Sequence, residues 1–376
     1  MATDKIRQFD AVIIGAGQGG KPLAVDLAGA GWKTALIERE HLGGTCVNTG
    51  CTPTKTMVAS ARAAHLALRG ESYGVQCSSI DIDMVKIRDR KRKIVQSFRS
   101  GSEKLVEQTE GLTLFRGEGR FVSEREVEVS SDKNEPYRLT SSRIFIDAGT
   151  RPRVPPIDGL ESVSYLDSAT IMELDHVPEH LIVMGGGYVG LEFGQMFRRF
   201  GSRVTIVERA GQLMGREDKD VASALEEILS DEGIDIVLNA TVNRVSQQSD
   251  GSLELTLKAQ DGESSLTGSH LLVASGRIPN SDLLNLDAAG IEIDERGFIK
   301  CNDRLETSVE GVYVIGDVKG GPAFTHISYD DYRVLKTNLL EGGNASISGR
   351  LLAYTVFTDP QLGRAGLTEA EAKSQG

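Results

Sequence analysis

The chain has 376 residues, with 54 acidic and 42 basic side chains and a formal net charge of -12. This charge would repel a phosphate backbone or an anionic lipid surface, so neither nucleic acid nor a membrane is an expected partner. The length allows two or three domains with their own cores. Four cysteines are too few for an extracellular disulfide framework.

The first predicted element is an apolar strand over residues 11–14, which runs into the turn Gly15-Ala16-Gly17-Gln18-Gly19-Gly20. A helix is expected next, and a second strand over 34–37 ends at Glu38. The apolar run 11–16 is too short for a signal-peptide core or a membrane span. We therefore expect a cytoplasmic protein.

Two cysteines, Cys46 and Cys51, lie in the segment HLGGTCVNTGCTPTK at 41–55. In a regular helix, Cα atoms five residues apart lie roughly 8 to 9 Å from each other, and a disulfide needs about 4.4 to 6.8 Å. The pair can close only if Cys46 lies in a loop or distorted turn, for which the nearby glycines supply the freedom. Pro53 suits the first turn of a following helix, which would place Cys51 near an N-terminus that stabilises a thiolate.

A zinc half-site and a pair of structural thiols are the alternatives to a redox-active pair. Zinc needs further ligands, and Cys77 and Cys301 are lone cysteines without a second close pair. We favour the redox-active pair.

The sequence patterns between residues 84 and 159 predict a helix, two strands and a linker. Apolar residues recur at helical spacing between 84 and 106, and we assign the basic cluster 86–93 within them to a solvated helix face rather than to an anion site. Alternating stretches at 126–129 and 143–146 predict antiparallel strands. The proline-rich run 151–159 predicts a linker.

The pattern of residues 11–38, a strand, a glycine turn, a helix and a second strand that ends in glutamate, then recurs. A strand over 181–184 runs into Gly185-Gly186-Gly187-Tyr188-Val189-Gly190, and a strand over 203–207 ends at Glu208. Glu208 follows its turn at the same spacing as Glu38 follows the first turn. Each copy fits a βαβ dinucleotide-binding unit, so the predicted fold class is α/β, with two domains built on parallel sheets.

The glycines in such a turn have separate roles: a tight turn, close approach of backbone N–H groups to a pyrophosphate, and close packing of helix on strand. The acid accepts hydrogen bonds from ribose hydroxyls. Two copies imply two dinucleotides, and FAD with a nicotinamide cofactor is the economical pair. Glu208 favours NADH because its carboxylate would repel a 2′-phosphate, whereas Arg209 could hold that phosphate and favour NADPH.

With these motifs, the chain resembles the pyridine nucleotide-disulfide oxidoreductases, which include dihydrolipoamide dehydrogenase, glutathione reductase and mercuric reductase. GGTCVNTGCTPTK resembles their redox-active disulfide segment, most closely in the mercuric reductase branch. GGGYVGLEF resembles the nicotinamide motif, GRIPN the strand that closes that domain, and GVYVIGDV the second FAD motif. The resemblance covers essentially the whole length.

The resemblance implies a role for each matching residue. Tyr188 would gate the nicotinamide pocket, Asp317 would bind the ribityl chain, and Gly119 would lie near the FAD adenosine. The implied catalytic residues are Cys46, Cys51, Lys55 and Glu192, the last two as an ion pair beside the flavin. The implied FAD residues are Gly15, Gly17, Gly20, Glu38, Gly44, Thr45, Gly119, Gly149, Thr150, Gly316 and Asp317, and the implied nicotinamide residues are Gly185, Gly187, Tyr188, Gly190, Glu208, Gly276 and Arg277.

The implied reaction passes hydride from NADH or NADPH to FAD and then electrons to Cys51, which releases Cys46 as a thiol. Cys46 attacks a substrate disulfide, or both thiolates hold a soft metal ion such as Hg(II). The implied domains are an FAD domain with the redox disulfide over 1–153, a NAD(P) domain over 154–280, a second FAD part over 281–350, and the start of a truncated dimerisation domain over 351–376. A homodimer is the implied assembly.

Two departures from the family pattern leave alternatives open. The usual Ala-Thr-Gly stretch reads Ala148-Gly149-Thr150, and no His-Glu pair that would protonate the interchange thiol lies before Gly376. An NADH oxidase or diaphorase that uses oxygen or a quinone is therefore the second interpretation, and a flavin-binding fragment without turnover is the third. The sequence leaves the terminal acceptor open.

Overall fold

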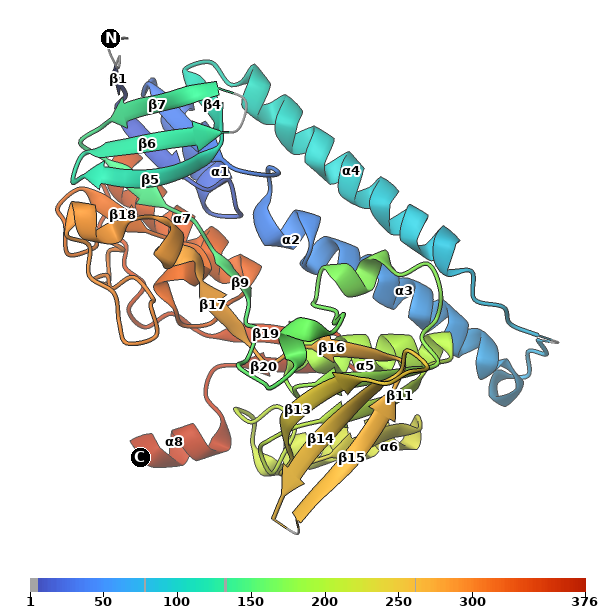
Figure 1. Ribbon diagram of the computed structural model, residues 1–376. Helices are drawn as coiled ribbons and strands as arrows, with labels where there is room; N and C mark the ends of the chain where they lie inside the picture. The colour runs from blue at the N-terminus through green and yellow to red at the C-terminus, as the bar shows by residue number, and fades with distance from the viewer. Residues whose placement is uncertain (1–5, 78, 132–133, 261) are drawn as a thin grey trace. The chain divides into compact units, whose positions relative to one another are not determined.

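The computed structural model describes residues 6–77, 79–131, 134–260 and 262–376 (Figure 1). These form two compact units, and each unit is assembled from segments that are far apart in the sequence. The first combines Met1–Thr52, Val95–Arg151 and Arg277–Arg350, and the second combines Pro53–Ile94, Pro152–Gly276 and Leu351–Gly376.

A parallel five-stranded sheet in the order β18-β8-β2-β3-β4 forms the centre of the first unit. Its strand β2 (Ala11–Ile14) is buried on both faces. Ala11 and Ile13 pack against helices α1 (Gly20–Gly29) and α7 (Thr325–Leu340), whereas Val12 and Ile14 face a second sheet. A strand covered on both faces is apolar throughout, which explains the run Ala-Val-Ile-Ile. The other strands are β3 (Thr34–Glu38), β4 (Leu112–Arg116), β8 (Ile144–Ile146) and β18 (Val312–Val314).

The second sheet of this unit has the order β1-β7-β6-β5, in which the last three strands are antiparallel neighbours. The unit is therefore layered as helices, parallel sheet and antiparallel sheet. The strands are β1 (Arg7–Gln8), β5 (Glu118–Ser123), β6 (Glu126–Ser131) and β7 (Asn134–Thr140), and the remaining elements are α2 (Gly44–Asn48), the start of α3 (Cys51–Leu68), the end of α4 (Met84–Gln108), β9 (Thr150–Pro152), β17 (Arg277–Pro279), η4 (Asn280–Leu283), η5 (Leu286–Ala289) and η6 (Gly316–Lys319).

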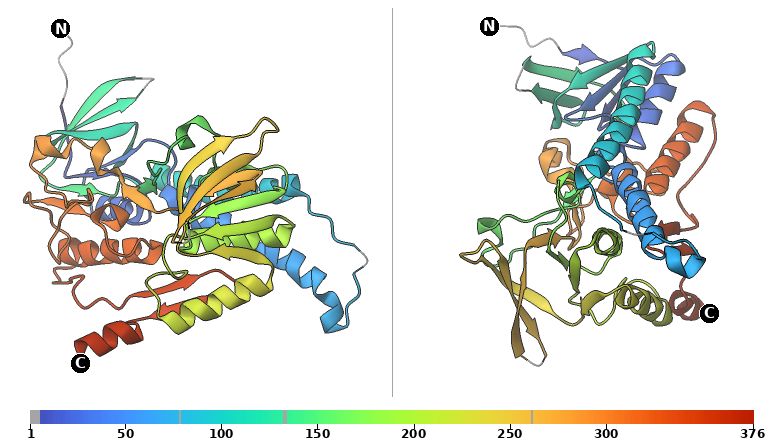
Figure 2. Two further views of the ribbon diagram at one scale, coloured as in Figure 1. Left: turned by 60° about the horizontal axis from the view of Figure 1, so that its bottom comes forward. Right: turned by 90° about the vertical axis from the view of Figure 1, so that its right-hand side faces the viewer.

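The second unit repeats this layering around a parallel sheet in the order β12-β11-β10-β16 (Figures 1 and 2). Leu181 and Val183 pack with the helices, and Ile182 and Met184 pack with the antiparallel sheet β13-β14-β15. The bounds are η1 (Gly70–Tyr73), η2 (Leu160–Ser162), η3 (Thr170–Glu173), β10 (His180–Met184), α5 (Tyr188–Phe200), β11 (Arg203–Val207), α6 (Lys219–Asp231), β12 (Ile234–Val237), β13 (Thr241–Gln247), β14 (Leu253–Ala259), β15 (Gly262–Gly268), β16 (His270–Val273), β19 (Ala353–Val356), β20 (Leu362–Ala365) and α8 (Glu369–Gln375).

The structure confirms the two parallel-sheet βαβ units, the helix over 84–106 and the antiparallel strand over 126–129. It corrects the strand over 143–146: β8 is parallel to both of its neighbours. All three of its residues are buried, as in a strand covered on both faces, so the period of two expected of a half-exposed strand is absent.

The chain changes unit at Arg151–Pro152 and at Gly276–Arg277, and the expected domain bounds at 153 and 280 stay predictions. Residues 53–94 pack with the second unit. The assignment of a cofactor to each domain stays a prediction, since compactness alone does not show what a unit binds.

Candidate functional site

The carboxyl ends of four neighbouring strands meet at one edge of the parallel sheet in the first unit. β2 leads into Gly15, β3 ends at Glu38, β8 is followed by Asp147, and β18 leads to Asp317. The N–H of Asp147 donates to the carbonyl of Ile14 at 2.8 Å, which keeps these chain ends side by side. Open α/β sheets bind ligands at this edge, so it is the candidate FAD site.

The glycine turn at this edge has no room for side chains. Gly15 has a φ of +101°, and a Cβ there would lie 2.2 Å from the carbonyl oxygen of Asp147. A Cβ on Gly20 would lie 2.3 Å from the carbonyl oxygen of Gly15. The turn can therefore bring α1 close to β2 and direct the helix N-terminus toward a phosphate. This local geometry fits a dinucleotide pyrophosphate.

Glu38 and Glu208 are held in the same way, each beside its own glycine turn. Glu38 accepts the N–H of Ala16 on Oε2 at 3.0 Å and the N–H of Glu40 on Oε1 at 2.8 Å. Glu208 accepts the N–H of Gly186 on Oε2 at 2.6 Å and the N–H of Ala210 on Oε1 at 2.8 Å. Both carboxylates are thereby fixed next to a turn, where a ribose would need an acceptor.

The second glycine turn is also closed to side chains at its ends. A Cβ on Gly185, whose φ is +120°, would lie 2.5 Å from the carbonyl oxygen of Ala274, and a Cβ on Gly190 would lie 2.0 Å from that of Gly185. Gly187 faces open space, and the half-buried Tyr188 begins α5 directly after it. The arrangement gives a ligand access to the N-terminus of α5, so this turn is the candidate nicotinamide site.

The cysteine segment forms two helices rather than one. Cys46 lies on the short helix α2, and Cys51 is the first residue of α3, with Thr49 and Gly50 between the helices. A break of this kind is what closure of the pair would require, and the disulfide itself stays a prediction. Cys46 is half-buried and Cys51 is exposed.

The same segment is bonded to the first glycine turn. The N–H of Gly43 donates to the carbonyl of Ala16 at 2.8 Å, and the Gln18 side chain donates to the carbonyl of Gly43 at 3.0 Å. Gly44, with a φ of +61°, approaches so closely that a Cβ there would lie 2.9 Å from the Cα of Gly17. The segment that carries the cysteines is therefore anchored directly to the backbone turn that would hold the FAD pyrophosphate.

Cys51 also contacts a residue that the motifs do not identify. Its Sγ lies 3.0 Å from Oγ1 of Thr325, the first residue of α7. The thiol thus lies at the N-termini of α3 and α7, both of which favour a negative charge. Only the sequence position just after the second FAD motif could have drawn attention to Thr325.

Asp317 is linked through Thr150 to Arg277. The Thr150 hydroxyl donates to Oδ2 of Asp317 at 3.2 Å, and Arg277 donates from Nε to the Thr150 hydroxyl and from a terminal nitrogen to its carbonyl, both at 2.7 Å. Burial raises the pKa of Asp317, and the positive charge of Arg277 opposes that rise. Arg277, which the resemblance assigns to the nicotinamide side, lies in the first unit.

Asp331 is a buried carboxylate that sequence analysis missed. It accepts the N–H of Gly316 at 2.9 Å and pairs with Lys319 at 3.4 Å and with Arg350 at 2.8 Å. These contacts hold the η6 turn, which presents Asp317. An acid in the second turn of α7, 15 residues after Gly316, carries no sequence signal that distinguishes it from a residue on a solvated helix face.

Lys55 and Glu192 form the expected ion pair within the second unit. The Lys55 ammonium lies 2.5 Å from Oε2 of the buried Glu192 and 4.6 Å from the centre of the Phe357 ring. The other carboxylate oxygen of Glu192 accepts the N–H of Phe357 at 2.9 Å. Phe357 thus contacts both members of the pair.

The remaining predicted residues are placed as follows. Thr45 is exposed on α2, and a Cβ on Gly119 would lie 3.2 Å from the Ile37 side chain. Gly149 and Gly276 both have positive φ and open space around them. The cysteines and the predicted FAD residues share the first unit, whereas Lys55, Glu192, Tyr188 and Glu208 belong to the second.

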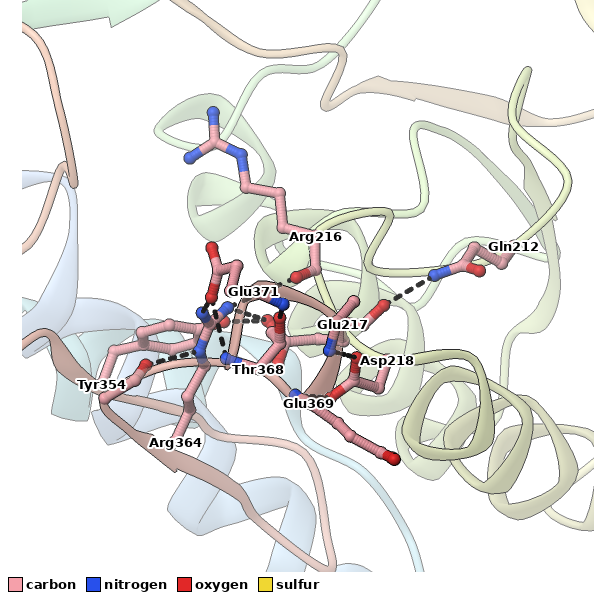
Figure 3. A network of polar contacts seen from close by, with 11 residues as sticks. Gln212, Arg216, Glu217, Asp218, Tyr354, Arg364, Thr368, Glu369 and Glu371 are labelled. Atoms are coloured by element: carbon pink, nitrogen blue, oxygen red, sulfur yellow. Dashed lines mark hydrogen bonds and ion pairs between the residues drawn. The ribbon is translucent and has the colours of Figure 1, made fainter. Parts of the chain in front are cut away.

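A polar network joins the loop after Glu208 to residues 351–376 (Figure 3). Arg364 pairs with Glu217 at 3.5 Å and also with Glu371, and the Tyr354 hydroxyl donates to Glu217. A terminal nitrogen of Arg364 donates to the Arg216 carbonyl at 3.3 Å, while the Arg216 guanidinium points away from the network. Burial raises the pKa of Glu217, and Arg364 opposes that rise.

Two features are absent from the described ranges. No group of three or more His, Cys, Asp or Glu side chains there could hold a metal ion. None of the helices described is long and apolar enough to cross a membrane.

Comparisons with known proteins agree on one family. Residues 9–331 match the model of the pyridine nucleotide-disulphide oxidoreductases. The chain is 37% identical to the probable pyridine nucleotide-disulfide oxidoreductase RclA of Escherichia coli K12, covering 99% of this chain and 80% of that protein. It is 35% identical to the mercuric reductase of Lysinibacillus sphaericus, covering 98% of this chain and 66% of the relative. The structure superimposes with a TM-score of 0.88 on the Cu(II) complex of the HOCl-induced flavoprotein disulfide reductase RclA from E. coli, at 36% identity and covering 99% of this chain and 80% of that one.

Proposed function

The chain belongs to the pyridine nucleotide-disulphide oxidoreductase family and is an FAD-dependent oxidoreductase, and we propose that it passes electrons from NADH to Cys46 and Cys51 and from them to a disulfide or a soft metal ion. The observation that carries this proposal is the bonding of the cysteine segment to the first glycine turn through Gly43 and Ala16. Because the segment and the turn share backbone hydrogen bonds, a cofactor held by the turn has the cysteines as its neighbours.

Each of the predicted site residues has a separate role in this proposal. Gly15, Gly17 and Gly20 admit the FAD pyrophosphate, Glu38 accepts the ribose hydroxyls, and Asp317 binds the ribityl chain. FAD, when bound, would supply the two-electron chemistry that links oxidation of a hydride donor to reduction of a disulfide. The N-termini of α3 and α7 and the Thr325 hydroxyl hold Cys51 as a thiolate. Cys46, on its separate helix, is the thiol that meets the acceptor.

Glu208 supports NADH as the electron donor. Both of its carboxylate oxygens accept backbone N–H groups, so the negative charge stays beside the turn. A 2′-phosphate would be repelled there, whereas a 2′-hydroxyl could donate to the carboxylate. Arg209 and Arg216 on the following loop are exposed and carry the competing attraction for a phosphate.

A panel of acceptors tests the proposal with the purified, flavin-loaded chain and NADH. The panel comprises a small disulfide, Hg(II), Cu(II), a quinone and oxygen, and Cu(II) is included because the solved E. coli relative is a Cu(II) complex. Cys46→Ser should abolish turnover of the disulfide and the metal ions and spare quinone reduction. Cys301→Ser, which changes a lone half-buried cysteine, is the matched control and should leave every rate unchanged.

Two results would contradict the proposal. Turnover of the disulfide and both metal ions that survives in Cys46→Ser would remove the cysteine pair from the reaction. Turnover confined to oxygen or the quinone in the unmodified chain would favour the NADH oxidase or diaphorase interpretation.

A further inference from the structure

The Asp147 carboxyl lies between the two sequence motifs that are proposed to hold FAD. Its Oδ2 accepts the N–H of Gly20, the first residue of α1, at 2.7 Å. A Cβ on Gly17 would lie 2.6 Å from that same oxygen, and a Cβ on Gly316 would lie 2.9 Å from Oδ1. One carboxyl oxygen therefore faces the first FAD motif and the other faces the second.

The charges around this carboxyl are unfavourable to its ionised form. Burial raises the pKa of Asp147 well above its ordinary value, and the nearby carboxylates of Asp317, Asp331 and Glu38 act in the same direction. The hydrogen bond from Gly20 acts in the opposite direction. Four cations of the same unit are engaged with other groups: Lys319 and Arg350 pair with Asp331, Arg277 donates to Thr150 beside Asp317, and Lys21 donates to Ser102.

A pyrophosphate placed on this turn adds two further negative charges close to the carboxyl. If Asp147 stayed ionised, it would repel those charges from a buried position, where screening by solvent and salt is weak. As the neutral acid it loses this repulsion and gains an O–H donor.

We propose that Asp147 is a determinant of FAD binding that acts as the neutral acid, so that FAD binding takes up one proton from solvent at this carboxyl. The inference rests on the FAD site proposed above and goes beyond it, because it assigns a proton and a pH dependence to a residue outside both motifs.

The sign of the pH dependence follows from linkage. A bound pyrophosphate raises the pKa of Asp147 further, so the FAD complex holds the proton more tightly than the flavin-free chain. Between the two pKa values, the Kd for FAD rises with pH, by up to about tenfold per pH unit for one proton. Below the lower pKa, Asp147 is neutral in both states and the Kd is independent of pH.

The stability of the flavin-free chain gives a second readout. The pKa of Asp147 in the folded chain lies above its unfolded value, so the stabilisation is complete at low pH and is lost as pH rises through the folded pKa. Asp147→Asn has no proton to lose at this position. Its melting temperature should therefore fall less steeply than that of the unmodified chain as the pH rises.

The test is titration of the full flavin-free chain with FAD at several values between about pH 5.5 and 8.5, followed by flavin fluorescence. Asp147→Asn should flatten the dependence of Kd on pH and should bind FAD more tightly than the unmodified chain at the alkaline end. Asp10→Asn is the matched control, because Asp10 is an exposed carboxylate of the same unit that accepts the N–H of Lys33 at 2.7 Å. It should keep the slope of the unmodified chain.

A measurement on the unmodified chain alone guards against a variant that fails to fold. Calorimetric FAD binding in buffers of different ionisation enthalpy should show net proton uptake in the same pH range. Zero uptake would overturn the proposal, as would equal slopes for Asp147→Asn and the unmodified chain, or weaker FAD binding by a folded Asp147→Asn at every pH. A chain that binds no FAD at any pH would contradict the proposed function as well, so the two failures are distinguishable.

Discussion

At the scale of single residues, the placement of Cys51 decides which thiol can serve as a stable thiolate. Cys51 begins an 18-residue helix, and its sulfur lies 3.0 Å from the Thr325 hydroxyl at the start of α7. Two helix N-termini favour a negative sulfur there, and the Thr325 hydroxyl could donate to a thiolate. Cys46 lies inside the five-residue helix α2, where the dipole is small.

Absorbance spectra of cysteine variants test this asymmetry. Cys46→Ser should leave Cys51 as a thiolate against the flavin and give a long-wavelength charge-transfer absorbance, which Cys51→Ser should lack. In the Cys46→Ser background, Thr325→Val should move the pH midpoint of that absorbance upward by about one to two units, because a hydrogen bond to a charged group contributes about 1.5 to 3 kcal/mol.

Thr325→Ser keeps the hydroxyl and is the control for that shift, so it should restore the midpoint. A charge-transfer absorbance in Cys51→Ser but not in Cys46→Ser would reverse the roles of the two cysteines. An unchanged midpoint in Thr325→Val would remove the hydroxyl from the thiolate site.

The residues that could be predicted from the sequence are those whose chemistry depends on neighbours in the chain. The glycines of both turns and the acids Glu38 and Glu208 belong to this class, because a local turn and strand define their positions. Asp147 and Thr325 do not, since the partner of Asp147 is 127 residues away and that of Thr325 is 274 residues away. Only the order of the strands brings such pairs together.

At the scale of secondary-structure elements, residues 351–376 hold the loop that follows Glu208 through hydrogen bonds and an ion pair. Asp218 occupies the N-cap position of α6, yet its carboxylate accepts the N–H groups of Glu369 and Ala370 at the start of α8. In the middle of the loop, the N–H of Met214 donates to the carbonyl of Gly186 in the second glycine turn at 2.9 Å. The loop thus connects α8 to the candidate nicotinamide site.

Arg364→Gln should loosen this connection and weaken coenzyme binding. Both Arg364 and Glu217 have side chains that are at most 10% exposed, and breaking a buried ion pair costs about 3 to 5 kcal/mol. We expect a lower melting temperature, faster proteolytic cleavage near residue 351, and a higher KM for NADH with an unchanged kcat.

Arg203→Gln is the control for Arg364→Gln, because it breaks an exposed pair with Asp235 in the same unit. A surface pair contributes about 0 to 1 kcal/mol, so this variant should behave almost like the unmodified chain. Equal losses in the two variants, or an unchanged KM for NADH in Arg364→Gln, would contradict a positioning role for the C-terminal segment.

At the scale of the whole molecule, one design occurs twice, in two units that each have their own core. Each unit places a parallel sheet between helices and an antiparallel sheet, and each holds an acid against its glycine turn with two backbone N–H groups. The parallel strands and their glycine turns were predictable because both are local patterns. The antiparallel layers and the contacts of residues 351–376 were less predictable from the sequence, because their partners are set by the topology of the fold rather than by spacing along the chain.

This duplication predicts that the two dinucleotide sites can be weakened separately. Glu38→Gln should weaken FAD binding and Glu208→Gln should weaken NAD⁺ binding, because each loses a charged acceptor that contributes about 1.5 to 3 kcal/mol, roughly a ten- to hundredfold rise in Kd. Binding of NAD⁺, which transfers no hydride to oxidised FAD, isolates affinity from turnover. In the double variant the two losses of binding free energy should add within about 0.5 kcal/mol, as for sites that share no partners.

Glu208→Gln should also narrow the preference for NADH over NADPH, while Glu38→Gln should leave it unchanged. If Glu208→Gln instead weakened FAD binding as much as NAD⁺ binding, the two acids would belong to one coupled site and the duplicated design would not translate into two independent ones.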